Sequence, residues 1–558
     1  MRSTAPFVMA MLILLSGTAS PQIQLSFQGE PYFDGAMTMS LEAPEHVGEV
    51  PLIAFGLLPL TPPAMSDYGP YHIGLLLGVI PTAPIGPDER VDLSFAMSTE
   101  DPGVVGVSLI VQGFLDNQLS NPATLTMAYP YFVPEDALLI TSPNPMQQAN
   151  FGDRVALGDL NDDGHQDIIV GAWFEDYLGI EKSGRVYIFW GPDFATNMAL
   201  DPVDPKPWGE MGNGFVVADL DGDGIDDLVV AEDGGDGTLP TFGYIHVYYG
   251  DAAFSATPSL LIQSPGTGSV YSLWGRKLAV GDLDGDSFGD IVVGVDKATI
   301  NGFALAGRVD VYWGPTFAVR AEVVSPTPGQ DGRFGVKVAC ADANGDGIDD
   351  LFEASCGDDV GGLPNVGSAH IFTGPALQLY ATIPNPFPAP GMPCFGLGMH
   401  AADLDGDGIA EAIVSDEKDR VFVFGGPDYT SYQIIPKPPS AIVNPFGETS
   451  YGYEYATGDI NSDGLADLLI TDIFDGDLEG CFIDGGGVVF GALGPYYSTF
   501  HRIIDVSPAC ENAFGWTLAL GDIDGDNHLE LIVGSVTADG GGVFNTGHAT
   551  IFDLAGIN

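Results

Sequence analysis

Residues 219–227 read D-L-D-G-D-G-I-D-D and run directly into the apolar residues 228–230. Acidic side chains stand at positions 1, 3, 5 and 9 of this nine-residue loop, and glycine at position 6 permits a sharp turn. Calcium accepts six to eight oxygen ligands in flexible geometry, and position 7 of such loops supplies a backbone carbonyl. An EF-hand needs Glu at position 12 and flanking helices, whereas position 12 here is Val230 in a β-branched run. The stretch therefore predicts a calcium loop that leads into a strand.

Seven copies of this loop recur along the chain at spacings of 56 to 63 residues. Each of the 28 side-chain ligand positions carries an oxygen ligand. A single Asp-Gly-rich stretch is usually a solvated turn, but seven copies in register indicate a repeated structural unit that binds metal. We therefore predict about seven bound Ca²⁺ ions.

The predicted ligands follow loop by loop, in the order of positions 1, 3, 5, 7 (backbone carbonyl) and 9. They are Asp159, Asn161, Asp163, His165 and Asp167; Asp219, Asp221, Asp223, Ile225 and Asp227; Asp282, Asp284, Asp286, Phe288 and Asp290; Asp342, Asn344, Asp346, Ile348 and Asp350; Asp403, Asp405, Asp407, Ile409 and Glu411; Asp459, Asn461, Asp463, Leu465 and Asp467; and Asp522, Asp524, Asp526, His528 and Glu530.

Position 6 is glycine in five loops, Ser287 in the third and Asn527 in the seventh. Asn tolerates a left-handed backbone better than Ser does. We therefore expect the third loop to bind calcium most weakly.

The chain begins like an exported protein. Arg2 precedes an apolar run over 6–15 and small residues over 16–20, which predicts a signal peptide over 1–20 that is cut after Ala19. The run is too short to span a membrane, and no later stretch has the roughly 18 apolar residues that a span needs. We expect a secreted, extracellular or cell-surface protein that does not cross the membrane.

The composition suits an all-β protein of two domains, with 558 residues, 45% hydrophobic content and 76 Gly. The formal net charge is -59, from 17 basic and 76 acidic residues. Seven divalent ions would still leave the surface acidic, which argues against nucleic acid and anionic lipid as partners. The excess acidity is explained more simply by solubility or by tolerance of salt.

Five cysteines in an exported chain permit two disulfides and one free thiol. Cys340 lies in an apolar strand and is expected to be the free, buried thiol. Cys356 and Cys394 fall in loops expected on one face of the fold, and Cys481 and Cys510 fall in the corresponding loops two repeats later. We therefore pair Cys356 with Cys394 and Cys481 with Cys510.

Residues 21–132 contain seven short apolar or alternating runs separated by Pro and Gly, which predicts a small β-sandwich. This segment has no metal-type spacing and no catalytic constellation, and it leaves attachment, packing against the repeats and carbohydrate contact open. Residues 132–136 are the expected linker. The predicted strands are 23–27, 37–41, 52–58, 71–79, 91–97, 104–112 and 124–129.

Each repeat contains four strand-like runs in about 60 residues, as in 215–218, 228–231, 244–249 and 259–263 of the second copy. Seven such units predict a seven-bladed β-propeller over 137–558, which must close because an open array would expose two apolar ends. The last repeat ends after its third strand, 549–554. Residues 137–141 resemble 260–263, and we expect them to supply the missing strand of the last blade.

The order of the motifs resembles the FG-GAP (VCBS-like) repeat of integrin alpha subunits and of many exported bacterial proteins. The aromatic-glycine pair Phe151-Gly152 precedes the first loop, and 168–172 and 184–189 follow it. Aromatic-glycine pairs recur at 274, 334, 395, 451 and 514. The resemblance covers about 137–558 and implies a seven-bladed propeller with calcium in the hairpins between first and second strands.

The sequence also departs from the integrin pattern. All seven loops are complete here, whereas integrin alpha subunits carry them in some blades only, and Trp173 replaces the Pro that ends the GAP part. The further domains and the membrane span of an integrin have no counterpart. Heterodimerisation and transmembrane signalling are therefore not expected to carry over, and fold resemblance supports a binding role by analogy only.

A catalytic site is not expected. Residues 285–289 match G-x-S-x-G, but that motif needs a strand-to-helix turn, and Ser287 lies inside a predicted metal loop. The His residues form no H-E-x-x-H motif. The clustered carboxylates could in principle serve glycoside hydrolysis, but we expect them to bind calcium instead.

We expect a monomeric binding or cell-adhesion module whose protein or glycan ligand meets the long loops opposite the metal loops. Candidate contacts are Trp173, Phe174, Tyr177 and Phe474, although such aromatics commonly pack on their own loop. A polysaccharide-active enzyme and a purely structural surface or matrix protein stay open as alternatives.

Overall fold

The computed structural model divides the chain into two compact units, Met1–Tyr131 with Pro438–Ala441, and Phe132–Lys437 with Ile442–Asn558. Within 1–136 it describes the strands only. Beyond these it describes residues 137–232, 243–265, 274–388, 394–416, 420–438, 450–473, 487–494, 497, 499–505, 513–537 and 546–554. No helix in this part of the chain is long and apolar enough to cross a membrane.

The strands of the first unit form two sheets. One has the order β5-β4-β1-β7-β8 with β9 on β7, and the other has the order β2-β3-β6. The bounds are β1 Phe7–Leu15, β2 Gln24–Gln28, β3 Ala36–Glu42, β4 Pro51–Pro59, β5 Val79–Pro81, β6 Arg90–Ala96, β7 Val107–Leu115, β8 Gln118–Leu119 and β9 Ala123–Thr126. Most lie within a few residues of the predicted strands; most of the predicted 71–79 strand lies outside the described residues. The sandwich stays a prediction.

The apolar run predicted as an export signal forms β1, which pairs antiparallel with β4 and parallel with β7. Removal of the signal would take this strand out of the middle of its sheet. Cleavage after Ala19 stays a prediction.

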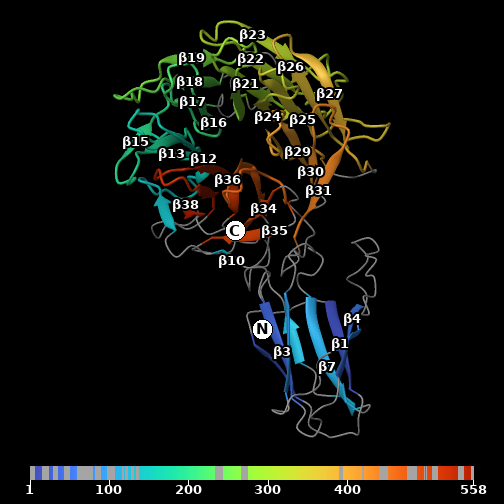
Figure 1. The fold of residues 1–558 in the computed structure, drawn as a ribbon. Coiled ribbons are helices and arrows are strands. Elements are labelled where there is room, and N and C mark those ends of the chain that lie inside the picture. Colours follow the sequence, from blue (N-terminus) through green and yellow to red (C-terminus); the bar gives the residue numbers. More distant parts are fainter. Residues whose placement is uncertain are drawn as a thin grey trace. The chain divides into compact units, whose positions relative to one another are not determined.

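The second unit is a seven-bladed β-propeller, as the repeats predict (Figure 1). The first strands of the blades are β12 (Phe151–Gly158), β16 (Phe215–Ala218), β20 (Lys277–Gly281), β24 (Phe334–Ala341), β28 (Met399–Ala402), β32 (Tyr455–Gly458) and β36 (Phe514–Gly521). The second strands are β13 (Asp167–Ala172), β17 (Asp227–Glu232), β21 (Asp290–Val295), β25 (Asp350–Ser355), β29 (Glu411–Asp416), β33 (Asp467–Asp472) and β37 (Glu530–Ser535).

The third and fourth strands complete each antiparallel blade. The third strands are β14 (Arg185–Phe189), β18 (Tyr244–Tyr248), β22 (Arg308–Tyr312), β26 (Ser368–Thr373), β30 (Arg420–Phe424), β34 (Val488–Leu493) and β38 (His548–Asp553). The fourth strands of the first six blades are β15 (Asn197–Leu200), β19 (Leu260–Gln263), β23 (Arg320–Val323), β27 (Gln378–Pro384), β31 (Tyr432–Pro436) and β35 (Thr499–Ile504). The short strand β10 (Tyr131–Phe132) pairs with β35 as a fifth strand of the sixth blade.

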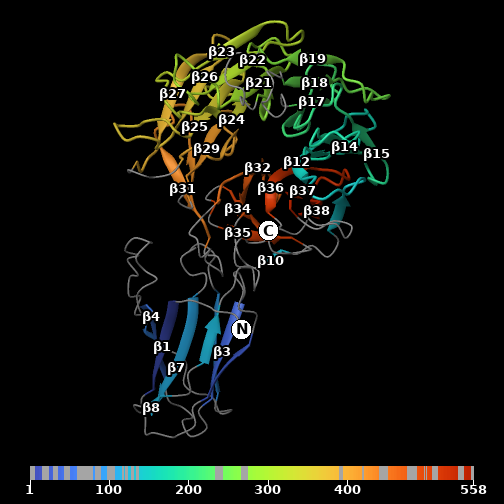
Figure 2. The ribbon, with the colours of Figure 1, turned by 180° about the vertical axis from the view of Figure 1, so that it is seen from behind.

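A strand from the start of the propeller completes the last blade. β11 (Leu138–Thr141) pairs antiparallel with β38, and Leu138 lies opposite Ile551. First strands of consecutive blades pack against one another in ring order, and β12 packs against β36. The ring in Figures 1 and 2 is thus closed by β11, the strand that precedes the first repeat.

Burial decreases from the second strand of a blade outward. All six residues of every second strand are buried, which explains the apolar residues that follow position 9. Among the fourth strands, β19 and β31 each bury a single residue. Buried aromatics such as Phe151, Phe334 and Phe395 fill the space between neighbouring sheets.

Cys356 and Cys394 form a disulfide, as predicted. Cys340 is free, as predicted, but is half-buried rather than fully buried. Cys481 and Cys510 lie outside the described residues, so their pairing stays a prediction.

Candidate metal centres

Each predicted calcium loop forms the hairpin between the first and second strands of a blade. Position 9 is the first residue of every second strand, so the ladder of hydrogen bonds fixes it. Its carboxyl group is buried in all seven blades, with 0% to 7% of the residue exposed. A buried carboxylate needs partners or a cation. The buried residues are Asp167, Asp227, Asp290, Asp350, Glu411, Asp467 and Glu530.

Carboxylates inside the loop hold its turn. In the second loop, Asp219 accepts hydrogen bonds from the N–H groups of Gly222, at 2.7 Å, and Gly224, at 2.9 Å. Asp223 accepts one from the N–H of Ile225 at 2.9 Å. These bonds recur in the other loops, for example from Gly347 to Asp342 and from Leu465 to Asp463. Hydrogen bonds between residues of the same loop therefore define its turn.

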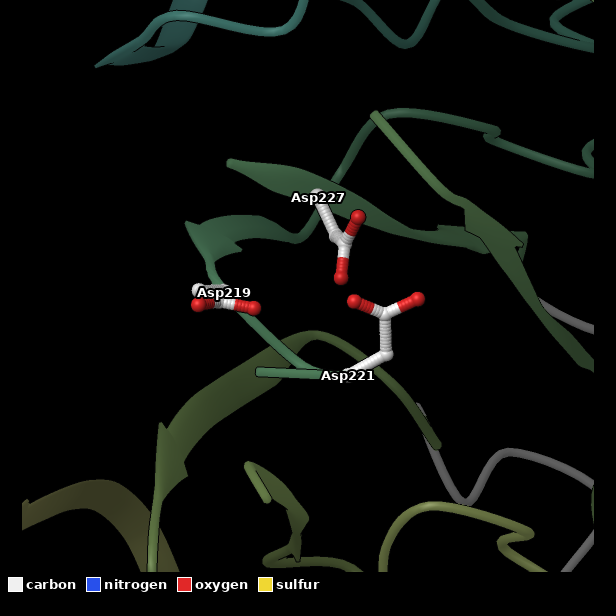
Figure 3. A group of neighbouring side chains, drawn as sticks. All are labelled: Asp219, Asp221 and Asp227. Carbon is white, nitrogen blue, oxygen red and sulfur yellow. The ribbon is translucent and has the colours of Figure 1, made fainter. Parts of the chain in front are cut away.

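Positions 1, 3 and 9 converge in four loops. In each, one oxygen from each residue lies within 4.8 Å of the others. Figure 3 shows Asp221 and Asp227 facing each other with Asp219 beside them. The groups are Asp219, Asp221 and Asp227; Asp282, Asp284 and Asp290; Asp403, Asp405 and Glu411; and Asp522, Asp524 and Glu530.

The other three loops have an amide, Asn161, Asn344 or Asn461, at position 3 instead of a carboxylate. In the fourth loop the Nδ2 of Asn344 donates to Asp350 at 3.0 Å. Position 5 is outside the groups of converging carboxylates, and its side chain accepts the N–H of position 7, the residue predicted to offer its carbonyl. The converging hard oxygens fit Ca²⁺ by ligand type. Calcium binding itself stays a prediction.

The buried carboxyl at position 9 also accepts a hydrogen bond from outside its loop. In the second blade, Asp227 accepts the N–H of Leu220 at 2.8 Å and the N–H of Gly250, after the third strand, at 2.7 Å. Analysis of the loops alone misses this glycine, although glycine recurs after the third strands of most blades. The equivalent donors are Gly191, Gly314, Gly374 and Gly494.

Burial raises the pKa of Asp227 to about 6, against the opposing effect of the N–H groups of Gly250 and Leu220. The charges of Asp221 and Asp219 raise it further. In the same way, burial and neighbouring loop carboxylates raise the pKa values of Glu411 and Glu530 to about 7. The loop thus holds carboxyl groups that repel one another in the absence of a cation, and a divalent ion would relieve that repulsion.

An acid at position 8 links two pairs of neighbouring loops. The N–H of Asp159 donates to Asp226 of the next blade at 2.9 Å, and the N–H of Asp282 donates to Asp349 at 3.0 Å. Sequence analysis assigns no role to position 8, since the contact depends on how the blades stack. The first and third loops are therefore braced by the blade that follows each.

The residue at position 6 has a left-handed backbone in every loop. Glycine has φ between 83° and 90° at this position, whereas Ser287 has φ 70° and Asn527 has φ 69°. The turn requires positive φ whatever the residue, which costs free energy for Ser. This geometry supports the prediction that the third loop is the weakest.

Trp173, predicted as a ligand contact opposite the metal loops, is buried with 9% exposed, and the face of its ring meets Arg276. Phe174 packs against Trp208, with Lys182 over both rings. These two aromatics pack on their own surroundings. Tyr177 is half-buried beside Arg185, and Phe474 lies outside the described residues.

Ser287 lies in the hairpin between β20 and β21, not in a strand-to-helix turn, and its N–H donates to Asp282 at 2.8 Å. This context does not support a nucleophile.

Comparisons with known proteins agree with the repeats. The sequence matches the FG-GAP repeat family at 151–189 and 514–552, in the first and last blades, and the FG-GAP-like repeat family at 219–293. The matched FG-GAP and FG-GAP-like repeats thus include residues of the first, second, third and last blades. The FG-GAP propeller resembles that of integrin alpha subunits. Integrin alpha-5 of Xenopus laevis is 29% identical over 223 residues, which is 38% of this chain and 20% of that protein.

A second group of relatives carries the name of an enzyme. The phosphatidylinositol-glycan-specific phospholipase D of Rattus norvegicus is 35% identical over 161 residues, which is 26% of this chain and 18% of that protein. The mouse enzyme is 32% identical over 192 residues, or 32% of this chain and 20% of that protein. The chain thus spans about a fifth of the length of these relatives.

Proposed function

We propose that this chain is an exported, calcium-stabilised FG-GAP propeller that acts as a non-catalytic binding or adhesion module. The observation that carries the proposal is the repetition of one ligand set, with a buried position 9 carboxyl, in all seven blades. None of the 17 Lys and Arg residues lies in any of the seven loops. These carboxylates therefore need a cation from solution.

Calcium would be structural in this role. Extracellular modules bind it with dissociation constants near 10⁻⁴ to 10⁻³ M. At a free concentration about ten times that constant, each site adds roughly 1.4 kcal/mol, or about 10 kcal/mol over seven independent sites. Such a sum is comparable to the net stability of a domain. A rigid ring held in this way presents its opposite loops to a protein or glycan ligand.

The experiment is a thermal melt of the secreted protein in excess chelator and across a calcium titration, with bound metal counted by elemental analysis. We expect about seven ions and a rise in Tm of about 10 °C, since the unfolding entropy of a propeller of this size is roughly 0.9 kcal/mol/K. NaCl at matched ionic strength is the control for screening of the net charge. One or two ions, or a rise that NaCl reproduces, would overturn the calcium role.

A further inference from the structure

Each blade contributes two residues to the hub of the propeller, at the start of its first strand. They follow a glycine whose φ lies between 83° and 96° in all seven blades, which identifies equivalent positions. The pairs are Asp153 and Arg154, Asn213 and Gly214, Arg276 and Lys277, Val336 and Lys337, Leu397 and Gly398, Tyr453 and Glu454, and Trp516 and Thr517. Four of the chain's 17 basic residues stand at these positions, in a protein of net charge -59.

Side chains from blades that are not neighbours in the ring meet at the hub. Glu454 of the sixth blade lies 2.8 Å from the Nζ of Lys337 in the fourth blade and 3.8 Å from Nη1 of Arg154 in the first. Lys337 also donates to the carbonyl of Tyr453 at 3.3 Å, and Arg154 donates to that of Asn213 at 3.3 Å. Contacts between the first, fourth and sixth blades place these groups on the axis of the ring.

The hub holds more positive than negative charge. Glu454 and Asp153 are the hub's acids, against Arg154, Arg276, Lys277 and Lys337. Two more acids approach from the rim. Glu210 lies 3.8 Å from Arg276, and Asp296 is balanced by Lys297 and Arg333 as well.

Lys277 lies beside other cations of the hub. Its pKa lies well below the usual range because of burial and the charges of Arg154 and Lys337. The Nε of Arg276 is buried with no hydrogen-bond partner, while the side chain as a whole is 30% exposed. Lys277 is half-buried, so both side chains remain accessible to solvent.

We propose that the hub binds one oxyanion group, a carboxylate or sulfate, with Arg276 and Lys277 as its direct contacts. A guanidinium offers paired donors that match the geometry of an oxyanion, and an ammonium adds a point charge. The hub residues stand at the start of each first strand, and the predicted calcium loop follows the end of that strand. The hub residues therefore lie toward the face opposite the calcium loops, where ligand recognition is proposed. The inference thus rests on the proposed binding function and adds that the ligand carries an oxyanion group.

The test is calorimetric titration of the calcium-loaded full chain with sodium sulfate, against NaCl at matched ionic strength. We expect one saturable site, a loss of at least tenfold in affinity in Lys277→Gln, and retention in Lys277→Arg. Lys206→Gln is the matched control, since Lys206 lies outside the hub beside the exposed Asp204. No saturable binding beyond the NaCl control, or equal affinity in Lys277→Gln and the unmodified chain, would overturn the site.

A second readout covers the case in which the variant simply unfolds. Without sulfate, Lys277→Gln should melt at a higher temperature, because it removes a cation held among cations. A lower Tm would show that the protein itself already satisfies this charge, which would overturn the proposal. The source of the oxyanion is tested by comparing galactose 6-sulfate with free sulfate. Tighter binding of galactose 6-sulfate would show that the site takes an anion carried by a glycan, and equal affinity would show that it takes the free ion. Calcium counts are measured separately, so failure of this site is distinguishable from failure of the calcium role.

Discussion

The two ends of the blades balance their buried carboxylates differently. At the loop end no Lys or Arg lies in any loop, and the acids face one another. At the other end each blade pairs a buried carboxylate with a Lys, Arg or His side chain of its own or a neighbouring strand. The pairs are Glu175 with Arg185, Glu232 with His246, Asp310 with Arg308, Glu353 with His370, Asp416 with Arg420, Asp472 with Lys437, and Asp505 with His548.

From this difference we expect metal dependence at one end of the ring only. Breaking one of these pairs should cost the same with or without calcium, whereas changing a loop carboxylate should cost more when calcium is present.

The largest single effect is expected from Glu353→Gln. Glu353 is fully buried and accepts hydrogen bonds from Ser355 at 2.6 Å and from Gly335 at 3.2 Å, besides its contact with His370 at 3.1 Å. Removing one partner of a buried pair typically costs about 3 to 5 kcal/mol. We expect a loss of about 3 kcal/mol in the free energy of unfolding, equal in calcium and in chelator, measured by denaturant titration.

The matched control is Glu322→Gln, at the same end of a blade. Glu322 pairs with Arg320 at 3.2 Å, but its side chain is 39% exposed. Exposed pairs contribute below about 1 kcal/mol. A loss from Glu353→Gln that doubled on adding calcium would contradict the independence of the two ends.

The next effect is expected from Asp167→Asn in the first loop. It should remove one bound ion and about 1.4 kcal/mol of calcium-dependent stability at ten times the dissociation constant. In chelator it should still cost about 1 to 3 kcal/mol, because an amide has only one oxygen to accept the N–H groups of Leu160 and Gly191, which the two carboxylate oxygens of Asp167 now accept. Asp162→Asn neutralises an exposed acid of the same loop outside the ligand set and is the control. Equal loss of calcium from both variants would show a diffuse charge effect instead of a site.

Sequence analysis predicts the fold well because its two determinants are local. The loop motif and its period define blade number, and the surplus strand 138–141 defines closure. The Cys356–Cys394 disulfide follows from the same reasoning about which loops share a face.

The sequence does not reveal which residues of different blades are in contact. Asp226 and Asp349 reach the preceding loop only because neighbouring sheets stack in one register. Lys337 and Glu454 are 117 residues apart, and the ring alone brings them together. Composition likewise cannot show that Arg276 covers the ring of Trp173, or that Phe174 packs against Trp208. Tyr177 and Phe474 stay candidate contacts.

A smaller effect should show that the loops differ in backbone strain at position 6. Ser287→Gly relieves a left-handed backbone with φ 70°, so we expect a gain of about 1 kcal/mol in unfolding free energy. Gly224→Ser, at φ 87° in the second loop, should lose a similar amount. Calcium titration of both variants checks whether the third loop gains affinity as the second loses it. An unchanged third loop would remove backbone strain as the reason for its predicted weakness.

The smallest effect concerns pH and distinguishes Glu loops from Asp loops. A carboxyl whose pKa rises on folding stabilises the calcium-free fold below about pH 4, and this contribution is lost as pH rises through 6 or 7.

Calcium competes with the protons on these carboxyl groups. Between pH 8 and 6.5, carboxyls with pKa about 6 lose roughly 1.3-fold in affinity, and Glu411 and Glu530, with pKa about 7, lose roughly fourfold. The difference is about 0.7 kcal/mol. Calcium isotherms at pH 6.5 should therefore resolve two weakened sites, and uniform weakening of all seven would show that the longer side chain is not what sets proton competition.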